Sequence, residues 1–239
     1  MSTTATTLIT PAEREGGRQR PKSGWLAISG LLLLSALPVI GGVLRLTTVG
    51  ADTEREIPLA SLVAIIAHIV AMTVFCLVGA FQFSPALRLR RGWHRAAGRV
   101  LIPAGIIAAL ASIWLAVFFS GPPEEFALAM VRLVFAVPMT GFLVIVIAIR
   151  RRDFVAHGAW MTRAYAIAVS GGTQALVSIL GTALMSTLWT LNNGEVDAYG
   201  EAWFVATGFV INSVVAELLI RRRAGRRIRG RLGRGALES

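Results

Sequence analysis

The chain has 239 residues, of which 55% are hydrophobic and 15% are charged, whereas roughly 25% of the residues of a typical soluble domain are charged. Its mean hydropathy is +0.66 and its formal net charge is +11. A 25.6 kDa globule cannot bury this much apolar surface, which excludes an ordinary soluble domain and leaves lipid as the solvent. The single cysteine, Cys76, excludes a disulfide framework and a metal site built on a CxxC motif.

Six apolar runs, each of about 20 residues or more, follow one another along the chain. At 1.5 Å per residue a helix of this length crosses the ~30 Å hydrocarbon core of a bilayer. Because lipid satisfies no backbone hydrogen bonds, the runs predict helices. The fold class predicted is an all-α integral membrane bundle of six transmembrane helices. The expected spans are Trp25–Leu44, Pro58–Phe81, Val100–Phe119, Phe126–Ile149, Ala164–Leu188 and Ala202–Ile220.

The basic residues are concentrated in alternate connections. The N-terminal segment, the connections after the second and fourth spans, and the segment after the last span together hold 21 of the 24 Lys and Arg residues. The positive-inside rule therefore predicts that both termini are cytoplasmic and that the protein lies in the cytoplasmic (plasma) membrane. The expected organisation is a disordered cytoplasmic tail at 1–24, a transmembrane domain at 25–220 and a basic cytoplasmic tail at 221–239.

The same distribution indicates the partners. A basic segment directly after a membrane span is attracted to anionic lipid headgroups by about 1 kcal/mol per residue. We therefore expect the basic loops and the tail to contact anionic lipids, with no nucleic acid as a partner.

Small residues at four-residue spacing predict close helix packing. They form two stripes, Ala104, Ala108 and Ser112 in the third span, and Ala164, Ala168 and Gly172 in the fifth. Three prolines are expected to kink their spans: Pro38, Pro103 and Pro138.

Polar residues inside the spans are the best pointers to function, since an unpaired polar group in lipid costs several kcal/mol. Arg132 is expected to extend outward toward Glu124 or Glu125. Glu217 precedes Arg221 by one helical turn, which predicts an i,i+4 ion pair.

His68 lies close to the centre of the second span, where an imidazole must face a partner, a cavity or a cofactor. A hydrogen bond to a neighbouring helix would satisfy it equally well. Gln174 and Asn212 lie near mid-membrane, and interhelical hydrogen bonds explain them.

His94 and His157 both precede spans that begin on the cytoplasmic side. Each has a tryptophan and arginines nearby, a pattern that also suits a simple interfacial anchor. Asp153 lies one turn before His157, and its carboxylate could accept a hydrogen bond from the ring N–H and so fix the tautomer.

These segments carry a family resemblance. The motifs are FQFSP (Phe81–Pro85), HRAAGR (His94–Arg99) and RRDFVAHGAWMTRAYA (Arg151–Ala166). In this order they resemble an uncharacterised bacterial family of predicted multi-spanning membrane proteins, a domain of unknown function, over about half of the chain. The resemblance implies a topology and no activity. The HRxxGR element is also similar to ferric-reductase-like and b-type cytochrome membrane domains, which implies haem b.

Two axial imidazoles of a haem must lie at the same depth on facing helices, as His94 and His157 are expected to do. His68 lies about 15–20 Å deeper by helix rise and would be a relay or a second partial site. Three hypotheses remain open: a b-type haem redox protein, a small-solute or proton permease lined by His68, Gln174 and Asn212, and a non-enzymatic membrane scaffold. The histidines have no companions that would make a hydrolase site.

Overall fold

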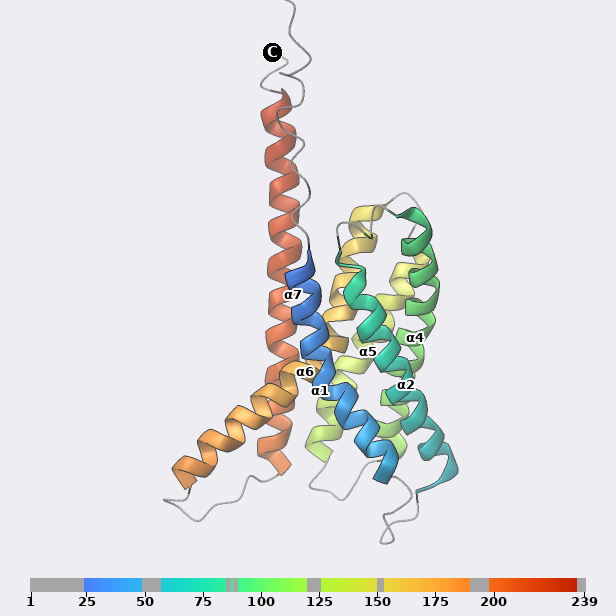
Figure 1. Ribbon diagram of the computed structural model, residues 1–239, viewed down its shortest axis with the longest axis vertical. Helices are drawn as coiled ribbons and strands as arrows, with labels where there is room; N and C mark the ends of the chain where they lie inside the picture. Colours follow the sequence, from blue (N-terminus) through green and yellow to red (C-terminus); the bar gives the residue numbers. More distant parts are fainter. Residues whose placement is uncertain are drawn as a thin grey trace, which may run out of the picture.

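The computed structural model describes residues 24–48, 57–84, 87, 90–119, 126–149, 153–189 and 198–235. All the long elements in these ranges are helices (Figure 1). Their bounds are α1 Trp25–Thr48, α2 Leu59–Phe81, α4 Arg91–Phe118, α5 Phe126–Ala148, α6 Phe154–Trp189 and α7 Ala198–Gly235.

The six predicted spans are confirmed, since all six helices are long and apolar enough to cross a membrane. Four helices extend beyond the predicted spans. Helix α1 continues past Leu44 to Thr48, and helices α4 and α6 begin before Val100 and Ala164. Helix α7 begins before Ala202 and continues past Ile220 into the basic tail. The apolar runs mark only the lipid-facing part of each helix, and the flanking segments are rich in Arg and Ala, which are good helix formers. The predicted tail at 1–24 lies outside the described residues, apart from Gly24.

Helices α2, α4, α5 and α6 form a ring of four, in which each contacts the next and α6 contacts α2. Helices α4 and α6 therefore face each other diagonally. Helix α1 packs against α2 and α6 on one side of the ring, and α7 packs against α6 and α5. The end of α2 and the starts of α4 and α6 lie at the same end of the molecule, at the top of Figure 1. The red end of α7 projects beyond the other helices there.

The core of the ring contains residues from all four of its helices. Phe75 is fully buried and lies among side chains of the other three helices, including Leu101, Leu143 and Tyr165. The Tyr165 hydroxyl donates a 2.9 Å hydrogen bond to the backbone oxygen of Cys76. The core is thus apolar, with its one phenol group satisfied by the backbone of a neighbouring helix.

Glycines allow the helices to approach closely, as the small-residue stripes predict. A Cβ on Gly172 would lie 1.7 Å from the backbone oxygen of Leu34, so α6 and α1 touch through their backbones. A Cβ on Gly79 would lie 2.4 Å from the ring of Tyr165. Ala104 and Ala108 in α4, and Ala164 and Ala168 in α6, are all buried. Pro38, Pro103 and Pro138 lie inside α1, α4 and α5.

The outer surface of the bundle is apolar. Leu26, Leu33 and Trp203 are each more than two thirds exposed, and many Val, Ile and Leu side chains accompany them. An apolar patch of this extent is stable only against lipid. The fold is therefore that of a multi-spanning α-helical membrane protein.

Candidate functional site

The first histidine site lies where α2 ends and α4 begins. His94 lies in the first turn of α4 and is exposed. Its Nδ1 lies 2.5 Å from the side-chain oxygen of Gln82, the residue that follows α2. Because an amide oxygen only accepts, Nδ1 is the donor in this arrangement and Nε2 carries the free lone pair.

His157 lies at the same end of the ring, in the first turn of α6, and is half-buried. Its imidazole is close enough to His94 for their charges to interact. The structure thus brings together the two histidines that the sequence pairs, from helices that face each other diagonally. It does not give Asp153 the predicted role: its carboxylate accepts the backbone N–H of Ala156 and caps α6.

The three sequence motifs meet beneath this site. Phe83, from the first motif, packs on the ring of Tyr165, from the third, with their centroids 5.0 Å apart. Gln82 of the first motif holds His94 of the second. The FQFSP segment therefore joins the two histidine segments.

Gln82 was not identified from the sequence as a site residue. A glutamine at a helix end is common, and only its contact with His94 across twelve residues distinguishes it. Its Nε2 is buried and has no hydrogen-bond partner among the described residues. Within that part of the chain, no three His, Cys, Asp or Glu side chains gather into a metal-binding group.

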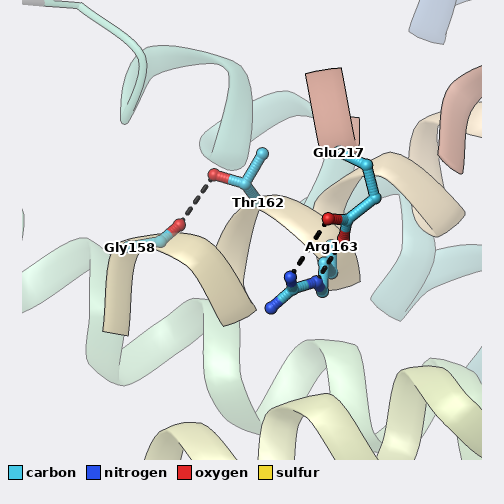
Figure 2. Close-up of polar contacts among 4 residues, drawn as sticks. All are labelled: Gly158, Thr162, Arg163 and Glu217. Carbon is cyan, nitrogen blue, oxygen red and sulfur yellow. Dashed lines mark hydrogen bonds and ion pairs between the residues drawn. The ribbon is translucent and has the colours of Figure 1, made fainter. Parts of the chain in front are cut away.

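A second polar cluster lies between α6 and α7 (Figure 2). Glu217 accepts hydrogen bonds from Nε of Arg163 at 2.5 Å and from its NH2 group at 3.2 Å. This corrects the predicted Glu217–Arg221 pair. Arg221 is near enough to interact electrostatically with Glu217, but the bidentate geometry of a guanidinium from the neighbouring helix is the stronger arrangement. Arg163 also lies over the ring of Trp160, 4.5 Å from its centroid.

Further into the membrane the same interface contains the predicted interhelical hydrogen bonds of Asn212. Its Nδ2 donates to the Ser170 hydroxyl at 3.2 Å, and its Oδ1 accepts from Thr173 at 3.1 Å. Gln174 packs against Gly208, where an added Cβ would lie 2.8 Å from the Gln174 backbone nitrogen. These residues therefore join α6 to α7 and do not approach the histidine end.

His68 forms a separate site between α2 and α4. Its Nδ1 lies 2.9 Å from the backbone oxygen of Ala108. Ala108 follows His94 by fourteen residues in α4, which places His68 about 21 Å away along that helix. Arg132 of α5 is close enough to interact electrostatically with His68. Glu124 and Glu125, the expected partners of Arg132, lie outside the described residues.

The fold and its motifs define a multi-spanning membrane protein. Residues 65–220, about two thirds of the chain, match the family described as "Predicted membrane protein (DUF2306)", a domain of unknown function. The chain belongs to this family. No curated protein and no solved structure matches it.

Proposed function

We propose that this protein binds haem b at the end of its four-helix ring, where His94 and His157 would be the residues that hold it. The observation that carries the proposal is the position of these histidines, each in the first turn of its helix, at the same end of diagonally opposed helices and within electrostatic reach of each other. Helical bundles commonly hold cofactors between side chains of facing helices. Two histidines are also a sufficient protein ligand set for a b-type haem.

A bound haem would supply one-electron chemistry, and the protein would supply its ligands and its surroundings. The apolar residues below the histidines, Phe83 and Tyr165 among them, would exclude water from one side of the group. The site lies at one end of the bundle, so it suits electron exchange at one membrane face.

The test is an absorption spectrum of the protein, purified in mild detergent after expression with ample haem, before and after dithionite. We expect a Soret band that sharpens and shifts on reduction. His94→Ala or His157→Ala should remove it, whereas His68→Ala should leave it unchanged because that residue lies about 21 Å away. A protein with no Soret band, or one whose band survives His94→Ala and His157→Ala together, contradicts the proposal.

His68 supports a second candidate function, a small-solute or proton permease. An imidazole and a guanidinium within electrostatic reach of each other are costly in an apolar membrane segment and often mark a pathway. Asn212 and Gln174 do not extend this pathway, because they pack between α6 and α7. Flux into proteoliposomes that is lost in His68→Ala would favour this candidate. If the protein shows no haem spectrum and no such flux, the results would favour a membrane scaffold.

We propose further, from the distribution of the arginines, that the protein lies in the plasma membrane with both termini on the cytoplasmic side. Cysteine labels at Glu195→Cys and Gly230→Cys should react from outside and inside respectively, while the buried Cys76 stays unlabelled.

The exposed arginines at the end of α7 are placed to attract anionic lipids. Reconstitution into vesicles with and without phosphatidylserine tests that contact, since replacing Arg222, Arg226 and Arg229 by Gln should remove the lipid preference.

A further inference from the structure

Gln82 has a defined position because α2 ends there. Its backbone N–H donates to the backbone oxygen of Gly79 at 3.0 Å, in the last turn of the helix. Gly79 is itself packed against the ring of Tyr165, which leaves no room for a side chain. The end of α2 is therefore fixed in position by its packing against Tyr165. From there the side chain of Gln82 reaches His94 at the start of α4.

The two ends of this amide have different surroundings. Its oxygen accepts from Nδ1 of His94. Its nitrogen is buried and has no partner within the described ranges. Leaving a buried amide donor unpaired costs about 1–3 kcal/mol, and native proteins contain few such groups. The nitrogen therefore needs an acceptor that the described part of the chain does not supply.

We infer that Gln82 is the positioning residue of the histidine site and that both the oxygen and the nitrogen of its amide form hydrogen bonds there. Its oxygen accepts from Nδ1–H of His94, which leaves the lone pair of Nε2 free to hold the iron of a bound haem. Its nitrogen would donate to a carboxylate oxygen of that group, such as a propionate. This inference rests on the proposed function, since it concerns the same ligand.

The opposite orientation of the amide makes a different prediction. The Gln82 nitrogen would then donate to Nδ1, the proton of His94 would lie on Nε2, and Nε2 could not bind iron without losing it. Which nitrogen carries the proton therefore separates the two arrangements. This property can be measured without any haem.

The first experiment is nitrogen NMR of the full chain in detergent, without haem and with ¹⁵N-labelled histidine. The chain has three histidines, and His94→Ala assigns the signal of His94. We expect the Nδ1–H tautomer in the wild type and a shift toward the Nε2–H tautomer in Gln82→Leu. Gln82→Glu keeps an acceptor for Nδ1–H and should retain the wild-type tautomer. An Nε2–H tautomer in the wild type, or an unchanged tautomer in Gln82→Leu, would overturn the inference.

The second experiment is haem titration of the wild type, Gln82→Leu and Gln82→Glu. Loss of a hydrogen bond behind a ligating histidine lowers affinity by about 10–100-fold, and we expect a loss of this size in Gln82→Leu. Gln82→Glu should also bind more weakly, because its carboxylate repels the propionate. If the wild type binds no haem but shows the expected tautomers, the proposed function fails and the positioning of His94 stands. If all three proteins bind haem equally, the inference fails and the proposed function stands.

Discussion

Two polar regions of the molecule differ in how completely their groups are paired. Between α6 and α7, Arg163 and Glu217 form a bidentate pair, and Asn212 bonds to both Ser170 and Thr173. At the histidine end, the Gln82 nitrogen is buried without a partner among the described residues, and two imidazoles lie within electrostatic reach of each other. Both regions consist of side chains that are expensive to place in or near lipid.

The difference separates polar groups that hold helices together from polar groups that, on our proposal, bind a ligand. A network whose members satisfy one another stabilises the folded protein and needs nothing else. A buried donor without a partner has a cost that a bound acceptor can remove. The α6–α7 cluster should therefore matter for stability, and the histidine end should matter for binding.

The largest effect on stability is expected where Gly208 of α7 packs directly against the backbone of α6. In Gly208→Ala the new Cβ would lie 2.6 Å from the Gln174 side chain and 2.8 Å from its backbone nitrogen, so the helices must separate. We expect a loss of about 2–3 kcal/mol in the free energy of unfolding, measured by denaturation in detergent. Gly225→Ala on the same helix meets nothing within 4 Å and is the matched control. Equal stability of the two variants would contradict the close contact.

The next effect concerns the ion pair between the two helices. Glu217→Ala should lower the free energy of unfolding by about 1–3 kcal/mol, because it leaves Arg163 without its bidentate partner. The loss stays below that of a fully buried pair, since the side chains are 25% and 38% exposed. In a double-mutant cycle, Arg163→Met combined with Glu217→Ala should cost less than the two single changes together. Simple additivity would show that the pair contributes nothing.

The smallest expected effect is the sharpest test of the comparison, because the change in the free energy of unfolding differs in direction between the α6–α7 interface and the histidine end. Asn212→Leu removes a satisfied amide and should destabilise the haem-free protein by about 1 kcal/mol. Gln82→Leu removes an unpaired donor, along with one hydrogen bond, and should leave stability unchanged or raise it by up to about 1 kcal/mol. Denaturation of both variants in the same detergent gives the comparison. A Gln82→Leu variant less stable than Asn212→Leu would show that the histidine end is also a structural network.

The sequence predicted the helices well because lipid imposes a simple requirement. Every span must be apolar and about 20 residues long, so length and hydropathy identify it. The interfacial segments obey no such requirement, which is why the starts of α4 and α6 and the extension of α7 were missed. His94 and His157 were expected just before their helices and instead lie within the first turns.

The partners of the site residues could not be predicted as well as their positions. Glu217 has an arginine one turn away in its own helix, and local spacing favoured Arg221. The choice of Arg163 depends on how α6 and α7 pack. Asp153 likewise has a local partner, because its carboxylate accepts the backbone N–H of Ala156 in its own helix. The role of Gln82 depends on the position of α4 relative to α2, which no spacing within one segment encodes.

The central claim is that His94 and His157 bind one haem between them. The most direct measurement is haem titration followed by absorbance, with the thermal unfolding midpoint recorded at each step, for the wild type, His157→Ala and His68→Ala. Because a ligand that binds only the folded state raises its stability, we predict one haem per chain and a rising midpoint for the wild type and His68→Ala. His157→Ala should show neither. Haem that binds without saturating at one per chain, or that stabilises His157→Ala as much as the wild type, would contradict the account.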